Sequence, residues 1–392
     1  MLKVYIGPNG YGKSYAIDEE IKELKKENEA RKDIIKLGAE LVFAEEMKDS
    51  VNSSFVLDYL VEELLETDEI IAAREEYEKR INDSIKTNKQ NYNDIMDEVL
   101  KLNNKIRKQD VIDVSTKIEH KKLVSINSSD LKKSMGSGQK LQFLLKLIEA
   151  SSKKYVFLDE PENHTHPSLL HVTAGLINKL SKTKDVCVAT HSPELLSLLD
   201  VDFNNLYIFN SEDYSGPKKI DFSTATSIPT GFHLENLNKK SQSYYSEETL
   251  KRNILEIHKK EFMASLFSKR VYLVEGLNDA IFLKKLLFHF SKQYSQYEIF
   301  HGYGKLHYLP FVNIFKSLGI EVIPIFDEDP KKADPKNNIV LNTELESCGK
   351  FCKFSPFIEE AIGYTGKKDC TTDFIDFLDE FNDYDSYKNI VD

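Results

Sequence analysis

Short apolar runs and helical patterns alternate along both halves of the chain. The runs at 2–6, 154–158 and 185–190 each end in polar residues, with helix-compatible stretches nearby. Two further runs, at 270–274 and 322–326, are also followed by polar residues. Buried strands that alternate with helices are typical of mainly parallel sheets covered by helices. The pattern therefore predicts an α/β protein made of two α/β units in series, without a repeat of fixed period.

A charged segment from about Leu57 to Arg107 interrupts this pattern and contains no Gly or Pro. Its apolar residues recur at helical spacings, which favours long helices, for example a hairpin of two. A solvated arm with one packed stripe is the simpler interpretation, and a dimerisation or DNA-contacting arm is the alternative. The turn-rich stretch at 211–248 indicates a boundary. We expect one domain at 1–245, with a helical insertion at about 57–122, and a second at 246–392.

Composition narrows the class of protein. The 392 residues are enough for two domains with sizeable cores. No apolar run approaches the ~18 residues of a membrane span, and residues 1–20 leave no room for a signal peptide, so we expect a cytoplasmic protein. The four cysteines are too few and too scattered for a disulfide framework or a zinc site. The net charge of -11 repels a phosphate backbone, so nucleic acid would need local basic patches or metal ions.

The first apolar run leads directly into the segment GPNGYGKS, residues 7–14, which fits the phosphate-binding pattern G-x-x-x-x-G-K-[ST]. Such a loop cradles a polyphosphate with backbone N–H groups and a helix N-terminus. Here Lys13 would reach the β- and γ-phosphates of ATP, and the Ser14 hydroxyl would ligate Mg²⁺. The loop residues that complete the cofactor site are Asn9, Gly10 and Gly12.

A second motif, YVFLDEPENH, follows at 155–164 and is rich in acidic residues. The apolar strand delivers Asp159 and Glu160 at its carboxyl end, where the ligands of parallel sheets collect. Asp159 can hold Mg²⁺ through water, and Glu160 can polarise the water that attacks the γ-phosphate. An acidic strand end that caps a helix is the alternative, but the phosphate loop in the same chain favours the ATPase interpretation.

The order of motifs resembles the ABC-type ATPases. A Ser/Gly-rich segment, SMGSGQK at 134–140, precedes a helical stretch, and Thr190-His191 ends the strand at 185–190. The resemblance implies that the signature residues Ser137, Gly138 and Gln139 close on ATP held by a second subunit, with Ser134 as the alternative serine. It also implies that His191 senses the γ-phosphate and that ATP joins a homodimer. Glu45 or Glu46 would take the place of the glutamine loop.

A second group of carboxylates lies in the C-terminal third. One strand ends at Glu275, with Asp279 four residues later, and the next ends at Asp327-Glu328-Asp329. Neighbouring parallel strands would bring these ends together, and Asp327 and Asp329 would face one ion because residues two apart point the same way. Oxygen ligands of this kind suit Mg²⁺ or Mn²⁺, and two such ions can clamp a phosphodiester. Acidic, solvated strand ends are the alternative interpretation.

Three features of this region together resemble the TOPRIM domain: Glu275-Gly276 at one strand end, HGYGK at 301–305, and the Asp-x-Asp strand. An ABC-type ATPase followed by a TOPRIM domain resembles the OLD (overcoming lysogenization defect) family of ATP-dependent nucleases. The resemblance implies a further metal-binding acid at Glu359, with Glu360 as the near alternative. It also implies a late catalytic lysine at Lys367 or Lys368.

The resemblance implies an ATPase that also cuts DNA with Mg²⁺ or Mn²⁺, acts in anti-phage defence, and binds no membrane. Its catalytic residues would be Glu160, His191, Glu275, Asp327, Asp329 and Lys367. An ATP-switched sensor or scaffold is the main alternative, and a transporter subunit would leave the carboxylates without a task. The sequence leaves open an RNA or tRNA substrate, a higher oligomer, a defence partner, and whether ATP activates or restrains cutting.

Overall fold

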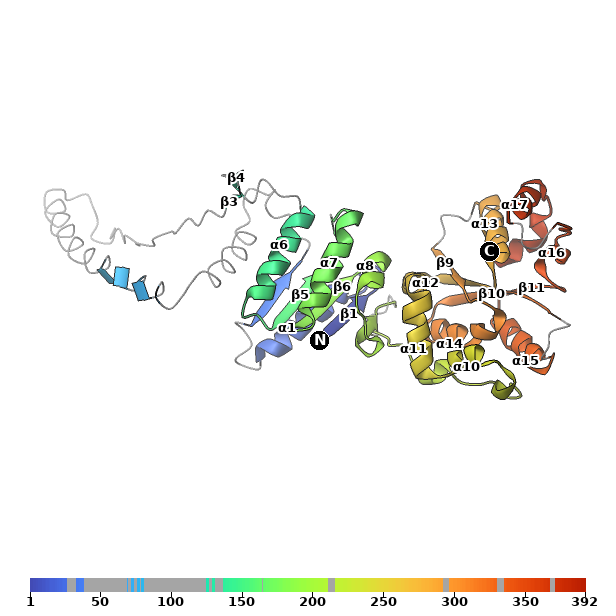
Figure 1. Cartoon of the computed structure of the whole chain (residues 1–392), viewed down its shortest axis with the longest axis horizontal. Coiled ribbons are helices and arrows are strands. Elements are labelled where there is room, and N and C mark those ends of the chain that lie inside the picture. Colours follow the sequence, from blue (N-terminus) through green and yellow to red (C-terminus); the bar gives the residue numbers. More distant parts are fainter. Residues whose placement is uncertain are drawn as a thin grey trace, which may run out of the picture. The chain divides into compact units, whose positions relative to one another are not determined.

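The computed structural model contains two compact units, formed by residues 1–39 with 153–392 and by residues 40–152. Figure 1 shows the chain coloured from the N-terminus in blue to the C-terminus in red. The residues that the structure describes are 1–26, 33–38, 69, 72–73, 76–77, 79–80, 125–126, 129–130, 137–163, 165–210, 216–291, 296–329, 335–366 and 371–392.

The first compact unit contains two sheets, and the first of them holds the phosphate loop. Within the described residues this sheet has five strands in the order β2-β5-β6-β1-β7, and every neighbouring pair is parallel. Because the strands are parallel, their carboxyl ends lie along one edge, which is where this class of sheet binds ligands. The strands are β1 (Leu2–Ile6), β2 (Ile34–Leu37), β5 (Tyr155–Asp159), β6 (Asp185–Thr190) and β7 (Leu206–Ile208).

Helices cover the two faces of this first sheet. Ile17 and Ile21 of α1 (Lys13–Lys26) pack in one core cluster with Tyr5, Phe157 and Ala189. The alternate strand residues face the other side, where α7 (Pro167–Leu180) contacts β6 and α8 (Pro193–Leu198) packs on α7. A sheet covered on both faces explains why its strands read as almost continuous apolar runs.

The second sheet has four strands among the described residues, in the order β11-β10-β8-β9, and it is also parallel throughout. Residue Val274 pairs with His301 at one end of β8, and Leu273 pairs with Pro324 of the central strand. The carboxyl ends of β8 and β10 are therefore neighbours. The strands are β8 (Arg270–Val274), β9 (Tyr297–His301), β10 (Glu321–Asp327) and β11 (Cys352–Phe354).

One face of the second sheet packs on α13 (Leu277–His289) and α17 (Thr371–Glu380) around Tyr272, Ile323 and Phe354. On the other face, α12 (Lys259–Ser265) and α14 (Tyr308–Leu318) meet β9 through a chain of aromatic rings. Phe300 lies 4.5 Å from Phe311 and 5.8 Å from Phe315 between ring centroids. Two further helices, α15 (Pro335–Glu346) and α16 (Ile358–Ala361), follow β10 and β11.

The segment between the two sheets is built from short helices. Lys259 Nζ donates to the Leu199 carbonyl at 2.8 Å, and Lys218 Nζ donates to the Leu318 carbonyl at 3.2 Å. These contacts tie the end of α8, and the residue that forms a bridge with Ile208 after β7, to the second sheet's helices. The segment contains α9 (Phe222–Ala225), α10 (Lys239–Gln242), α11 (Glu247–Asn253), a π-helical turn (Ile254–His258) and, within the part described, 3-10 turns at Leu234–Asn236 and Ser243–Tyr245.

The second compact unit is described only in part. It contains the antiparallel pair β3 (Ser125–Ile126) and β4 (Ser129–Asp130), and α6 (Ser137–Ala150). Most of the predicted insertion at about 57–122 lies outside the described residues, and the few positions described there are helical. None of the helices in the described ranges is long and apolar enough to cross a membrane. The two parallel sheets with helical cover confirm the predicted α/β class.

Candidate functional site

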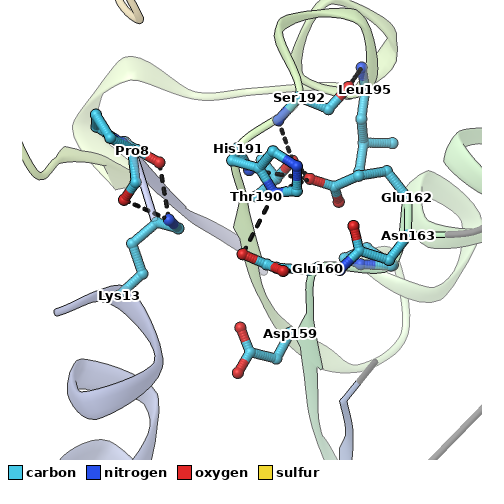
Figure 2. Close-up of polar contacts among 12 residues, drawn as sticks. Pro8, Lys13, Asp159, Glu160, Glu162, Asn163, Thr190, His191, Ser192 and Leu195 are labelled. Carbon is cyan, nitrogen blue, oxygen red and sulfur yellow. Dashed lines mark hydrogen bonds and ion pairs between the residues drawn. The ribbon is translucent and has the colours of Figure 1, made fainter. Parts of the chain in front are cut away.

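The phosphate loop lies between the carboxyl end of β1 and the N-terminus of α1. Gly7 has φ 144°, and a Cβ there would lie 2.0 Å from the Phe209 carbonyl oxygen, so only glycine fits. Lys13 is buried, and its Nζ donates to the carbonyls of Gly7 at 2.8 Å and Pro8 at 2.9 Å (Figure 2). The ammonium group of Lys13 is thus bound by carbonyls of the loop itself, next to the backbone N–H groups that would bind phosphates.

Ser14 and Asp159, the residues predicted to hold Mg²⁺, are in contact. Ser14 Oγ donates to Asp159 Oδ1 at 3.1 Å. Burial raises the pKa of Asp159, while the Ser14 hydrogen bond opposes this change. Burial lowers the pKa of Lys13, opposed by the charges of nearby acids, of which Glu160 contributes most. The structure therefore brings loop, helix and β5 together as the sequence predicted.

Glu160 lies next to the predicted sensor histidine. Its backbone has φ 51°, and its N–H donates to the Ala189 carbonyl at 2.8 Å, which turns the chain sharply after β5. Asn163 Nδ2 donates to Glu160 Oε2 at 2.7 Å. His191 Nδ1 lies 3.3 Å from Glu160 Oε1, within ion-pair distance but without hydrogen-bond geometry. Figure 2 marks this contact with a dashed line.

Glu162 is a site residue that the sequence analysis assigned no role. Its side chain is only 8% exposed. Its Oε1 accepts hydrogen bonds from Thr190 Oγ1 at 2.6 Å and from the His191 N–H at 2.9 Å (Figure 2). Glu162 therefore fixes the turn that carries His191. The sequence shows Glu162 as the third acid of the Asp-Glu-Pro-Glu segment. The direction in which its side chain points, however, depends on the turn at Glu160.

The predicted signature residues belong to the other compact unit. Ser137, Gly138 and Gln139 form the first turn of α6, and Gly138 is buried. Ser134 and the predicted glutamine-loop acids Glu45 and Glu46 lie outside the described residues. Contact between this helix and a nucleotide on another subunit stays a prediction.

At the second sheet, Glu275 contacts the backbones of two other segments. Its Oε1 accepts from the Asp327 N–H at 3.3 Å, and its Oε2 accepts from the Lys305 N–H at 3.4 Å. The end of β8 is therefore joined to the end of β10 and to the HGYGK turn. The convergence that the sequence predicted for Glu275 and Asp327 is present.

Asp327 and Asp279 share this acidic environment. Burial, followed by the charge of Glu275, raises the pKa of Asp327 to about 7, although Asp327 Oδ1 accepts from the Ile358 N–H at 2.9 Å. Burial, followed by the charge of Asp327, raises the pKa of Asp279 well above its ordinary value. Asp279 Oδ2 accepts from the Gly276 N–H at 2.8 Å, so this acid also caps the start of α13.

Lys305 is the second residue to which the sequence analysis gave no role. Its side chain is fully buried, and its Nζ lies 3.3 Å from Asp329 Oδ2 and donates to the Asp327 carbonyl. Asp329 reaches this lysine through a left-handed backbone, φ 52°, after β10 has ended, rather than through strand alternation. The predicted lysine, Lys367, and its alternative Lys368 lie outside the described residues.

Glu359 lies at the same edge through a contact with α13. Asn278 Nδ2 donates to Glu359 Oε1 at 2.9 Å. The charge of Glu359 also contributes to the raised pKa of Asp327, so the two acids are close enough to interact. Glu360, the near alternative, is exposed. The sequence analysis assigned no role to Asn278.

The side chains at the second sheet are of the type that binds a hard divalent cation, but they are not arranged around a common metal position. Within the described ranges, no group of three or more His, Cys, Asp or Glu side chains is arranged to hold a metal ion. All the acids that converge offer carboxylate oxygens, the ligands that Mg²⁺ and Mn²⁺ prefer. The raised pKa values of Asp327 and Asp279 indicate negative charge that a bound cation would neutralise.

The described cysteines form no disulfide. Cys187, Cys348 and Cys352 are free thiols, and Cys370 lies outside the described residues. Burial raises the pKa of the Cys348 thiol, which disfavours the thiolate.

Comparison with known proteins finds a family model for part of each half of the chain. Residues 13–197 match a family model described as "AAA domain, putative AbiEii toxin, Type IV TA system", and residues 266–329 match one described as "Overcoming lysogenization defect protein-like, TOPRIM domain". No curated protein matches the chain. Among solved structures, "Crystal structure of Stu0660 of Streptococcus thermophilus" is similar at 10% identity and TM-score 0.38, covering 66% of this chain and 80% of that one. A likeness this weak carries no argument.

The two family models follow one another in the order that the motifs predicted. The first covers the phosphate loop from Lys13, the Asp159-Glu160 strand end and His191. The second covers Glu275, Lys305, Asp327 and Asp329. With an AAA-type ATPase domain followed by an OLD-like TOPRIM domain, the chain has the ATPase–TOPRIM architecture of the OLD family.

Proposed function

We propose that the protein is an ATP-controlled, divalent-metal-dependent DNA endonuclease. The observation that carries the proposal is the meeting of Glu275, Asp327 and Lys305 at the carboxyl ends of β8 and β10. Placing several carboxylates and a buried lysine side by side costs free energy because the charges lose water. Such clusters are found preferentially at functional sites. Its position at the edge of a parallel sheet, in a domain of the TOPRIM type, favours phosphodiester chemistry over a structural role.

In the ATPase half, each contacting residue has a distinct task. Lys13 would leave the loop carbonyls to pair with the β- and γ-phosphates, and Ser14 and Asp159 would hold Mg²⁺. Glu160 orients and polarises the attacking water. Glu162 holds the backbone of His191, so that a change at the γ-phosphate is passed to the turn that begins α8.

In the nuclease half, the carboxylates of Glu275, Asp327, Asp329 and Glu359 would hold Mg²⁺ or Mn²⁺. When bound, such ions supply Lewis-acid stabilisation to a phosphodiester and lower the pKa of a bound water. Lys305 keeps Asp329 and the end of β10 in place through its ammonium group. Asp279 adds a buried carboxyl that caps α13 beside Glu275, and Asn278 orients Glu359.

The homodimer joined by ATP and the role in anti-phage defence are parts of the same proposal. They rest on the signature residues at the start of α6 and on the OLD-family architecture. A dimer would also bring two nuclease sites into one particle, which suits the cutting of both strands of a duplex. ATP-dependent dimerisation is measured by light scattering with and without nucleotide, and Ser137→Arg should prevent it.

The proposal is tested by incubating the purified chain with supercoiled plasmid and Mg²⁺ or Mn²⁺, with and without ATP. Cleavage should require the metal, and Asp327→Ala should abolish it while ATP binding remains. Asp376→Ala, an exposed acid on α17, is the matched control and should cut like the wild type. Cleavage at an unchanged rate in the Asp327 variant would refute the nuclease assignment.

One observation favours a second candidate function. Among the described residues no three acids are already placed to ligate a metal, and Lys305 supplies a positive charge within the cluster. A TOPRIM domain that binds nucleic acid or a protein without cutting would make the chain an ATP-switched sensor. In that case the Asp327→Ala variant would keep its biological activity, which separates the two functions.

A further inference from the structure

The HGYGK turn at the second sheet carries an exposed aromatic residue, Tyr303. It is 57% exposed, although it lies only two residues before the buried Lys305. The proposed mechanism uses Lys305 and Glu275 but assigns no task to this ring. Single exposed apolar side chains are common on protein surfaces, so exposure alone does not indicate a function. The backbone and the surroundings of Tyr303 supply the further evidence.

Hydrogen bonds on both sides of Tyr303 hold the turn against the end of β8. Before the tyrosine, the Gly302 N–H donates to the carbonyl of Val274, the last residue of β8, at 3.0 Å. After it, the Lys305 N–H donates to Glu275 Oε2 at 3.4 Å. The ring is therefore carried by a short piece of chain that is fixed directly beside the proposed metal-binding acid.

The backbone of Tyr303 is in the left-handed region, with φ 51°. This region favours glycine, and other residues adopt it at a cost in free energy. Among the described residues, three further non-glycine residues have positive φ, and two of them, Glu160 and Asp329, belong to the sites already discussed. Strained residues are found preferentially at functional sites, so this conformation favours a role for Tyr303.

A buried neighbour orients the Tyr303 ring. The ring lies against the imidazole of His258, with ring centroids 5.3 Å apart and 53° between the planes. His258 is only 1% exposed, and its Nε2 lies 3.0 Å from Tyr244 Oη. The tyrosine is thus ordered from the inside while much of it stays open to solvent. A ring held in this way can stack on another flat group at a small entropic cost.

A nucleic-acid substrate offers such a flat group in its bases. In a paired duplex the faces of the bases are covered by neighbouring base pairs, whereas an unpaired base exposes a face that can stack on an aromatic ring. Stacking on a tyrosine needs no positive charge on the protein. This matters because the net charge of -11 repels the phosphate backbone.

We infer that Tyr303 stacks on an unpaired base next to the phosphodiester that is cut, so that the site prefers locally unpaired DNA over a fully paired duplex. The inference rests on the proposed nuclease function and deepens it, because it names the form of DNA that the site binds. Each site of a dimer would take one strand, so an opened duplex could still be cut in both strands.

Cleavage of two end-labelled duplexes by the full chain with Mn²⁺ tests the preference. The duplexes share one strand, and the second strand either pairs throughout or leaves several central bases unpaired. The wild type should cut the central segment faster when it is unpaired. Tyr303→Ala should cut the unpaired segment about tenfold more slowly, the size expected for loss of one base–aromatic stack, and the paired segment at an unchanged rate. Tyr303→Phe should keep the preference because it keeps the ring.

A fluorescent base, 2-aminopurine, reports the stack without cleavage, because its emission falls when it stacks. It is placed in the unpaired segment, and Ca²⁺, which also binds carboxylate oxygens, replaces Mn²⁺. The wild type and Tyr303→Phe should lower the emission on binding, and Tyr303→Ala should not. An unchanged emission with the wild type, or equal loss of emission with the Ala variant, would overturn the inference.

Two further variants control for damage to the fold. Glycine adopts φ 51° without strain, so Tyr303→Gly removes the ring, keeps the turn and should behave like Tyr303→Ala. Both variants should bind Mn²⁺ like the wild type, which separates loss of the ring from damage to the carboxylates. Phe288→Ala removes a ring that is 70% exposed on α13 and should change neither assay.

The outcomes separate the inference from the proposed function. If the wild type cuts both duplexes equally, or if both ring-free variants keep the preference, Tyr303 does not stack on the substrate and the nuclease assignment stands. If Tyr303→Phe also loses the preference, the hydroxyl rather than the ring acts and the inference is wrong. If the wild type cuts neither duplex, the proposed nuclease function fails and the inference fails with it.

Discussion

Lys305 Nζ and Asp329 Oδ2 lie 3.3 Å apart, and the lysine side chain is fully buried at this contact. The HGYGK turn thus places one positive charge inside a group of acids that would otherwise repel one another. The lysine also donates to the Asp327 carbonyl, which ties the end of β10 to the turn after β9. The arrangement makes Lys305 the best-positioned cation for the proposed nuclease chemistry among the described residues.

Replacement of Lys305 by Met should abolish plasmid cleavage and leave ATP hydrolysis unchanged. Met keeps most of the buried aliphatic volume but leaves Asp329 and the Asp327 carbonyl without their charged donor. Loss of one partner of a largely buried pair should also lower the free energy of unfolding by about 2 kcal/mol, below the fully buried range because Asp329 is partly exposed. Urea unfolding and a cleavage assay measure the two effects, and wild-type cleavage by this variant would contradict the assigned role.

Replacement of Glu162 by Ala should lower the kcat of ATP hydrolysis by about tenfold or more with little change in KM, because it removes a positioning residue. The variant loses the acceptor that holds Thr190 Oγ1 and the His191 N–H, so His191 is no longer fixed near the γ-phosphate. Steady-state hydrolysis with varied ATP separates the two constants. Glu194→Ala, an exposed acid at the start of α8, should behave like the wild type. Equal kcat in both variants would remove Glu162 from the site.

Replacement of Gly7 by Ala should abolish ATP binding. The added Cβ would lie 2.0 Å from the Phe209 carbonyl, a backbone atom that cannot swing away. Gly175→Ala in α7 is the control, because a Cβ there meets nothing within 4 Å and alanine favours a helix by about 0.5–1 kcal/mol. It should bind ATP normally and unfold at a slightly higher temperature. Normal ATP binding by Gly7→Ala would show that the loop tolerates a shift.

Stability should fall as the pH drops from about 6.5 to about 4, because His258 is buried and burial lowers its pKa to about 4. The unfolded chain, with an ordinary histidine pKa near 6.5, binds the proton first across this window, so acid favours unfolding. Tyr244 Oη lies 3.0 Å from His258 Nε2, and the buried His307 adds a like charge when both are protonated. The full effect is about 3 kcal/mol.

The variant His258→Gln isolates this contribution from the other groups that titrate in the same window. Its free energy of unfolding, measured in urea at several pH values, should depend less on pH between 4 and 6.5 than that of the wild type. Identical slopes for the two proteins would show that His258 is protonated in the folded state or solvated.

The sequence was sufficient to predict those site residues that directly follow a strand along the chain. The phosphate loop, the Asp159-Glu160 strand end and the carboxylates after β8 and β10 were predicted because each follows a buried parallel strand. Parallel strands collect their carboxyl ends at one edge, so contacts such as Ser14 with Asp159 follow directly.

The sequence was insufficient where a side chain's role depends on a turn. Glu162 points back to Thr190 only because the backbone at Glu160 is left-handed, and no periodicity predicts that. Lys305 follows a loop glycine with φ 110° and enters the interior, whereas lysines are mostly placed at the surface. The resemblance implied a late lysine, Lys367, which lies outside the described residues, and the sequence analysis assigned no role to the buried one.

The central claim is that acids from β8 and β10 bind divalent cations together. Electron paramagnetic resonance of Mn²⁺ in nucleotide-free protein counts the ions bound. The wild type should bind Mn²⁺, Glu275→Gln and Asp327→Asn should each lose it, and Glu360→Gln, an exposed acid beside Glu359, should retain it. Equal Mn²⁺ binding by the wild type and both site variants, or none by the wild type, would contradict the account.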